Sequence, residues 1–471
     1  MTRGQGRFDP VFFLEITMNN IKEFLKQAAH VKPDKNQLRL ITETPFYAFV
    51  HFSPNTYTNK EWGDGKEKPE IFNPTELDCD QWCEAIKSAG MKGAVITAKH
   101  HDGFCLWQTQ YTSHSMKSSP YKNGRGDIVR EFSDACRRHG LKFGFYLSPW
   151  DRHSELYGTD AYNDYYKAQL TELLTNYGEV FHVWFDGACG EGANGKKQTY
   201  DFDGYFELIH KYQPNATIFN DRGPIRWCGN ESGDAHYAEW SVVPVELCGF
   251  SEVQTGPGPL ADEGSLDYMY NTDNNIGSVS NIIYSKGLVF APSEVDMSIR
   301  PGWFYHAEEE AHSLDRLFKT YINSVGNNTS FILNVPPMPN GKFDETDVLR
   351  LKELGDKINS EFGVNIAENA EITVTPYNNS ETQREIVIDM GEEKAVKYLD
   401  FGENTAEGQR VESFTVKYYD NTEGWQTDYG AYGTTVGARK IVKLGERKTS
   451  KIKIIITSAR DVPEFSFIKI H

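Results

Sequence analysis

The sequence predicts an α/β fold: a (β/α)8-like TIM barrel followed by a C-terminal antiparallel β-sandwich. From about residue 46, short apolar β-prone runs alternate with longer amphipathic stretches, which is the pattern of parallel strands joined by helices. From about residue 364, short runs alternate polar and apolar residues with period two, and turn residues separate them. The 471 residues also exceed the roughly 250 to 300 at which single cores stop growing. We therefore expect a catalytic barrel with an N-terminal extension over 1–363, and the sandwich over 364–471.

Eight apolar runs supply the expected barrel strands. They lie at 46–54, 93–101, 143–150, 181–187, 216–220, 238–243, 289–295 and 330–337. The stretch 244–288 has weak helical periodicity and many Gly and Asn residues, so the barrel is expected to be irregular there. A doubly wound open sheet is the structural alternative, but no Gly-rich phosphate loop follows the first run.

Amphipathic segments between these runs predict the covering helices. In 74–90, Leu77, Trp82 and Ile86 share one face, and Pro74 suits the first turn. Further helices are expected at 126–140, 160–178, 204–212, 309–326 and 345–363, several of them closed by Gly. Beyond them, period-two runs such as "VESFTVKYY" and "SKIKIIIT" predict the strands of the sandwich.

The charge and composition restrict the class of partner. Lys and Arg number 49 against 67 Asp and Glu, and the net charge of −18 disfavours nucleic acid and anionic membrane surfaces. The 9 Trp, 25 Tyr and 28 Phe suit neutral polar ligands such as sugars. No run approaches the roughly 18 apolar residues of a membrane span, and "VFFL" is shorter than the about 7 of a signal peptide. We expect no membrane insertion and see no signal peptide in this chain.

Polar and aromatic residues stand where the predicted strands end, which in such barrels is where active sites form. They are His51, Glu61 and Trp62 after the first strand, His100 and His101 after the second, Tyr146 and Asp186 at the third and fourth, Arg222 after the fifth and Trp303 after the seventh. Any one of them could merely cap a helix, but the ring as a whole indicates a ligand site. The seven scattered Cys and the His pair lack partners at metal-ligand spacing, so hydroxyl recognition is expected and no metal.

Two carboxylates on different loops would allow glycoside cleavage, one to attack or to position water and one to protonate the leaving oxygen. Asp186 suits the first role, because it ends a buried strand and precedes Gly187, which leaves room for substrate. The residues alone leave the acid open between Glu191, Glu231 and Glu239.

Several of these segments resemble glycoside hydrolase family 29, the α-L-fucosidases, over about residues 40–360. The motifs are "HFS" from 51, "KHHDGF" from 99, "GFYLSPWD" from 144, "VWFDG" from 183 and "NDRG" from 220. The segments "DGACGEGANGKKQTYD", "RWCGNESG" and "RPGWFYH" resemble its subfamily B, which favours α-1,3- and α-1,4-linked fucose on branched, Lewis-type glycans.

The resemblance implies a retaining exo-fucosidase with Asp186 as nucleophile and Glu231 as acid/base. Glu239, in "YAEW", is the competitor, because other members place their acid in a similar Ala-Glu-aromatic context. It implies fucose binding by His51, Glu61, Trp62, His100, His101, Tyr146, Arg222 and Trp303.

The same resemblance implies a fucosylated oligosaccharide or glycan as substrate, no cofactor, and a periplasmic or extracellular location. Alternatives are a broad-specificity fucosidase of the other subfamily, a catalytically silent fucoside-binding protein, or a barrel hydrolase of another sugar.

Overall fold

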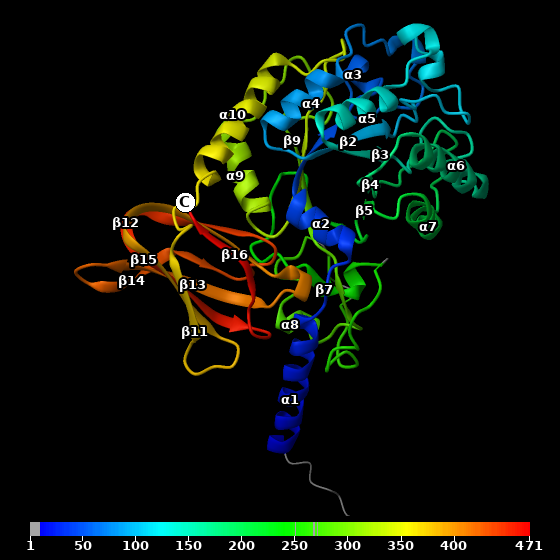
Figure 1. The fold of residues 1–471 in the computed structure, drawn as a ribbon. Helices are drawn as coiled ribbons and strands as arrows, with labels where there is room; N and C mark the ends of the chain where they lie inside the picture. Colours follow the sequence, from blue (N-terminus) through cyan, green and yellow to red (C-terminus); the bar gives the residue numbers. More distant parts are fainter. Residues whose placement is uncertain (1–9, 250, 267–268, 271) are drawn as a thin grey trace, which may run out of the picture.

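The computed structural model describes residues 10–249, 251–266, 269–270 and 272–471. Its N-terminal part is a barrel of eight parallel strands, which Figure 1 shows above the C-terminal sheet. The strands run in the order β5-β4-β3-β2-β1-β10-β9-β6. Their bounds are β1 Phe46–Val50, β2 Gly93–Lys99, β3 Lys142–Leu147, β4 His182–Trp184, β5 Thr217–Phe219, β6 Arg226–Trp227, β9 Ser293–Ser298 and β10 Ser330–Asn334. A bridge between Phe219 and Ile225, the residue before β6, joins the two edges. The barrel is thereby nearly closed, and the predicted fold class is confirmed.

The sixth and seventh strands were predicted in the wrong places. The sixth is the two-residue β6 rather than 238–243, and β7 (Val242–Pro244) instead pairs with β8 (Leu288–Phe290) in a separate antiparallel ribbon. The predicted run 289–295 is divided between β8 and β9. Pro292 stands between them and lacks the N–H that a continuous strand needs. A two-residue strand has no periodicity to detect in the sequence, whereas 238–243 has a clear apolar pattern. For this reason 238–243 was predicted as the sixth strand.

Helices cover the outside of the barrel, as the amphipathic segments predict (Figure 1). They are α3 Asn55–Thr58, α4 Cys79–Ser88, α5 Ile128–His139, α6 Asp160–Asn176, α7 Phe202–Tyr212, α9 Leu314–Ser324 and α10 Glu345–Phe362, whereas α8 (Val279–Ile282) packs on the β7–β8 ribbon. Side chains cap several N-termini; Asp127, for example, accepts a hydrogen bond from the backbone N–H of Arg130 at the start of α5. At the other end of α5, Gly140 adopts φ 69°, a left-handed conformation that ends the helix.

Two helices precede the barrel, α1 (Pro10–Ala29) and α2 (Lys35–Glu43). A capping box between Asp34 and Gln37 starts α2. Its Leu40 is buried in one cluster with Tyr47 and Phe49 of β1, so α2 packs against the N-terminal end of the barrel. Within the described ranges, no helix is both long and apolar enough to cross a membrane.

The C-terminal part is an antiparallel sheet of six strands. They are β11 Glu371–Pro376, β12 Arg384–Glu403, β13 Val411–Asp420, β14 Gly424–Gly433, β15 Lys440–Ala459 and β16 Phe465–Ile470. β12 and β15 each join two predicted strands, and their pairing shifts register between Asp389 and Lys394. A single apolar core draws on both halves of these strands, with Ile386 and Phe401 of β12 among its members. The boundary predicted near 363 falls between α10 and β11.

The C-terminal sheet contacts the end of the barrel at which the strands begin. Asn328, two residues before β10, accepts a hydrogen bond from the backbone N–H of Ala438 (2.7 Å). Gln409 likewise accepts one from the backbone N–H of Ser241 (2.8 Å). The opposite end of the barrel, where the strands finish, is therefore left to the βα loops.

Candidate active site

A cavity of about 160 Å³ lies at the C-terminal ends of the barrel strands. It is lined by Phe49, His51, Trp62, His100, His101, Tyr146, Trp184, Asp186, Ala188, Glu231, Asp296 and Trp303. Eight of the twelve candidate residues singled out from the sequence thus share one pocket, although they come from segments far apart in the chain. Glu61, Glu191, Arg222 and Glu239 do not line it.

Asp186 stands two residues after the end of β4 and is held by two hydrogen bonds. Its Oδ2 accepts one from the Tyr146 hydroxyl (3.0 Å), and its Oδ1 accepts one from the backbone N–H of Ala188 (2.8 Å). The side chain remains 26% exposed, so the carboxylate is reachable from the cavity while its orientation is fixed. A short acid on a rigid strand end can attack a carbon placed above it.

Glu231 belongs to the loop after β6 and faces the same cavity. The Trp303 indole N–H donates to its Oε2 (3.2 Å). Partial burial of the carboxyl group, together with the negative charges of Asp186 and Glu61, raises the pKa of Glu231, although the Trp303 hydrogen bond opposes this. A raised pKa favours the protonated form that a general acid needs.

The ring tautomer of His51 follows from its partner Asn334. The amide N–H group of Asn334 donates to the carbonyl of Trp303 (2.8 Å), so its oxygen accepts from His51 Nδ1 (2.8 Å). Nε2 of His51 is then left as an acceptor, and burial lowers the pKa of this imidazole to about 3. His51 is therefore a neutral ring suited to accept a hydroxyl proton.

His100 and His101 enter the cavity next to an irregularity in β2. The β2–β3 register shifts between Thr97 and Lys99, and the Lys99 ammonium group binds Asp151 (3.2 Å) behind the site. His101 Nδ1 lies 2.7 Å from the Ser148 hydroxyl, and its Nε2 lies 3.7 Å from Asp186 Oδ2. Burial lowers the pKa of both His residues. His100 Nδ1 is buried and makes no hydrogen bond within the described part of the chain.

Phe49, Trp184 and Asp296 also line the cavity. The sequence places Asp296 at the end of the seventh predicted strand, but none of the three was assigned a catalytic or fucose-binding role. Phe49 and Trp184 each stand two positions before a predicted residue, His51 and Asp186, on a strand whose alternate side chains share a face. That period-two relation could have identified them. The Trp184 ring stacks on Phe219 (4.2 Å between centroids), so the apolar floor of the cavity is rigid.

Two acidic residues of β9 belong to the site: Glu294 lies beneath the floor of the cavity, and Asp296 lies in the cavity wall. Glu294 is fully buried and accepts a hydrogen bond from the Trp184 indole N–H (2.8 Å). Asp296 lines the cavity and accepts one from the Trp227 indole N–H (2.9 Å). Burial, and for Asp296 also the charges of Glu231 and Asp186, raises the pKa of each well above its usual range. The raised pKa favours the uncharged form of both groups, in which each can also donate a hydrogen bond.

Glu61 and Arg222 lie outside the cavity wall. The carboxylate of Glu61 accepts hydrogen bonds from the backbone N–H of Trp303 (2.7 Å) and from His306 (2.6 Å), so it positions Trp303. Arg222 is exposed, and its guanidinium donates to the backbone carbonyl of Glu246. Neither long side chain could be oriented from sequence, because its target belongs to a distant loop.

Glu239 is placed at the other end of the barrel. It is 1% exposed and binds Arg226 (3.2 Å) and His236 (2.7 Å). Its Oε2 also accepts from the hydroxyl of Ser293, the first residue of β9. Burial is outweighed by these partners, which lower the pKa of Glu239 to about 2. A saturated, ionised carboxylate at the start of the strands is poorly suited to protonate a sugar bound at their ends.

No group of three or more His, Cys, Asp or Glu residues is arranged to hold a metal ion in the ranges that the structure describes. The pocket brings together the carboxyl groups of Asp186, Glu231 and Asp296, the imidazoles of His51, His100 and His101, and aromatic walls. Glycosidase active sites contain this set of functional groups.

Comparison with known proteins agrees with this geometry. The family model of the α-L-fucosidases matches residues 26–248 and 260–361. α-L-fucosidase 1 of Arabidopsis thaliana is 38% identical over 451 residues, which cover 90% of this chain and 84% of the relative. A putative α-L-fucosidase of Bacteroides ovatus has 40% identity and a TM-score of 0.86, covering 96% of this chain and 76% of that one.

A family 29 fucosidase of Ruminococcus gnavus, solved in complex with fucose, is 30% identical with a TM-score of 0.79. The match covers 94% of this chain and 95% of that one. The chain belongs to glycoside hydrolase family 29, the α-L-fucosidases, and is a glycosidase that acts on α-L-fucosides.

Proposed function

We propose that this α-L-fucosidase removes terminal α-1,3- and α-1,4-linked fucose from branched, Lewis-type glycans by a retaining double displacement. The observation that carries the proposal is that Asp186 and Glu231 line one small cavity, where the pKa of Glu231 is raised and the carboxylate of Asp186 is held by two hydrogen bonds. Retaining enzymes need this combination of nucleophile and acid/base.

In the first step, Asp186 attacks the anomeric carbon and forms a β-fucosyl ester, while Glu231 donates its proton to the departing glycosidic oxygen. Tyr146 and the backbone N–H of Ala188 hold Asp186 in position for this attack. In the second step, ionised Glu231 takes a proton from water, and the water oxygen displaces the ester. The two inversions return fucose in its α configuration.

The neutral imidazoles supply the binding of the sugar hydroxyls. His51 Nε2 is an acceptor, and the buried His100 Nδ1 gains a partner when a sugar hydroxyl reaches it. Trp303, held by Glu61, covers the apolar methyl group of fucose. Trp62 is 58% exposed beside His101, where it can contact the sugar that precedes fucose in the glycan.

The alkaline limb of the pH profile should report the protonation of Glu231. kcat/KM falls as pH rises through the pKa of Glu231, because the general acid is then ionised. Trp303→Phe removes the N–H that stabilises the carboxylate, so this limb should move to higher pH. The measurement is kcat/KM against pH for wild type and variant on an α-1,3- or α-1,4-fucosylated trisaccharide, whose leaving group needs the proton of the acid.

Trp62→Phe is the matched control for that shift, since Trp62 lines the same cavity without a hydrogen bond to Glu231 in the described structure. Its alkaline limb should coincide with that of the wild type. A limb that stays in place in Trp303→Phe, or moves to lower pH, would contradict the assignment of Glu231 as the acid.

The linkage preference rests on the resemblance of the loops around Asp186, Glu231 and Trp303 to subfamily B. A side-by-side assay of an aryl fucoside and an α-1,3- or α-1,4-fucosylated trisaccharide tests it. We expect the branched trisaccharide to have the higher kcat/KM. A strong preference for the aryl compound would favour the broad-specificity subfamily instead.

A further inference from the structure

A second cavity lies at the other end of the barrel, with a volume of about 350 Å³ against 160 Å³ for the catalytic pocket. It lies between α2, the end of α5 and the first residues of the strands, including Lys142 of β3 and Thr217 of β5. Asp186 stands just beyond the C-terminal end of β4, so the length of the barrel separates the two cavities. The volume falls within the range of about 300 to 1,000 Å³ typical of small-ligand sites.

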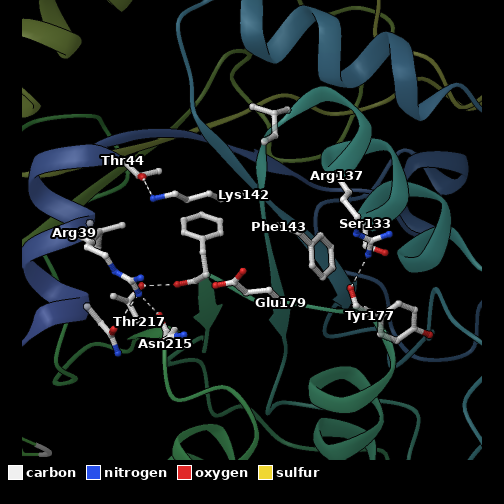
Figure 2. A pocket seen from close by; sticks show the side chains of 14 residues that line it. Arg39, Thr44, Ser133, Arg137, Lys142, Phe143, Tyr177, Glu179, Asn215 and Thr217 are labelled. Carbon is white, nitrogen blue, oxygen red and sulfur yellow. Dashed lines mark hydrogen bonds between the residues drawn. The ribbon is translucent and has the colours of Figure 1, made fainter.

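The floor of this cavity is apolar and aromatic. Phe143 is buried, and Phe181 and Leu40 line the cavity beside it. Rings of this kind pack against the C–H face of a sugar. The walls are polar: Figure 2 shows Arg39 and Lys142 on one side, Arg137 with Tyr177 on the other, and Glu179 between them.

Arg39 is the cation with the most unused hydrogen-bonding capacity. Its Nη2 donates to Asn36 (3.0 Å) and to the carbonyl of Asn215 (2.9 Å), whereas Nε and Nη1 make no hydrogen bond within the described residues. The other two cations have acids beside them: Arg137 lies 2.7 Å from Asp134, and Lys142 lies 3.6 Å from Glu43. Arg39 is therefore the natural anchor for a ligand carboxylate.

Glu179 supplies the complementary acceptor. It is exposed, and neither of its carboxylate oxygens accepts a hydrogen bond in the part of the chain that the structure describes. The three acids Glu43, Asp134 and Glu179 balance the positive charges of Arg39, Arg137 and Lys142. The cavity therefore has no net positive charge to favour a doubly charged phosphate ester. A ligand with one carboxylate and several hydroxyl donors matches Arg39 and Glu179 together.

We propose that this cavity is a second binding site, for a sugar acid: a pyranose ring that carries one carboxylate. The carboxylate binds Arg39 and Lys142, ring hydroxyls donate to Glu179, and the ring lies on the Phe143 and Phe181 floor. The site is independent of the fucoside pocket, and binding to it has a readout that does not involve hydrolysis.

Calorimetric titration with D-glucuronic acid and D-glucose tests this, because the two probes differ in the carboxylate at C6. We expect D-glucuronic acid to bind to wild type and to Asp186→Asn alike, at least tenfold more tightly than glucose, and to bind equally well when L-fucose saturates the catalytic pocket. No detectable binding, equal binding of glucose, or displacement by L-fucose would each overturn the proposal.

Arg39→Gln should weaken D-glucuronic acid at least tenfold, and Glu179→Gln should weaken it by a smaller factor. Lys35→Gln is the matched control, since Lys35 is on the same helix and binds Asn215 (3.2 Å) without lining the cavity. An equal loss of affinity for D-glucuronic acid in Arg39→Gln and Lys35→Gln would mean that the ligand is attracted only by general positive charge, and would overturn the proposal. Tighter binding of D-glucuronic acid by Glu179→Gln would also overturn it. Hydrolysis of an aryl fucoside in the catalytic pocket shows that each variant is folded. If Arg39→Gln does not fold, Lys142→Gln takes its place in the test.

Discussion

Asp186→Asn is expected to lower kcat on an aryl fucoside by about 10³-fold or more, because removing a catalytic nucleophile leaves only the binding and polarising groups. The exchange keeps the size of the side chain. The amide oxygen can keep the hydrogen bond from the backbone N–H of Ala188, and the amide nitrogen can donate to the Tyr146 hydroxyl, so the pocket should keep its shape. L-fucose should therefore still bind, and kcat is the quantity that falls.

Glu191→Gln is the control for this experiment. Glu191 is an exposed acid in the same loop, five residues after Asp186, and it does not line the cavity. Its kcat should stay within about twofold of wild type, as for most exposed substitutions away from a site. Near-wild-type kcat in Asp186→Asn would exclude Asp186 as the nucleophile.

Glu231→Ala should impair glycan hydrolysis far more than hydrolysis of an activated aryl fucoside. A glycan leaving group needs a proton from the acid, which is worth about 10²- to 10⁴-fold, whereas a nitrophenolate departs without it. Added azide should accelerate the variant on the aryl substrate, because it replaces the water that Glu231 no longer activates. The measurement is kcat/KM for both substrates, with and without azide; equal losses on both would argue against Glu231.

Glu239→Gln should behave differently, as a stability variant. Removing its charge leaves Arg226 and His236 without their buried partner, which typically costs about 3–5 kcal/mol. Because the folded-state pKa of Glu239 is lowered to about 2, its contribution is complete above its ordinary pKa and is lost as pH falls toward 2. Urea unfolding should show a large difference from wild type near neutral pH and a smaller one in acid. A selective loss on glycans would instead restore Glu239 as the acid.

The sequence predicted the barrel, most of its helices and eight pocket residues because these depend on local pattern and on strand ends. Asp186 illustrates this: a buried run that ends in an acid places it at the rim of the barrel. His100 and His101 follow the same rule, even though β2 shifts register just before them. Parallel strands bring their C-terminal ends together whatever the intervening loops do.

What could not be predicted depends on contacts between distant segments. Glu239 has the same local motif as a catalytic acid, and only its pairing with Arg226 and Ser293 shows that it lies at the opposite end. Arg222 and Glu61 are long side chains whose partners lie on other loops. β6 is held as a strand by its neighbour β9, since two residues have no intrinsic strand preference of their own.

Trapping the covalent intermediate tests the central claim most directly. A 2-deoxy-2-fluoro-α-L-fucosyl fluoride slows both steps but has an excellent leaving group, so the fucosyl-enzyme should accumulate. Peptide mapping by mass spectrometry should then find one fluorofucosyl group on the peptide that contains Asp186, and none in Asp186→Asn. A label on another carboxylate, or turnover by wild type that releases β-L-fucose first, would contradict the retaining mechanism with Asp186 as nucleophile.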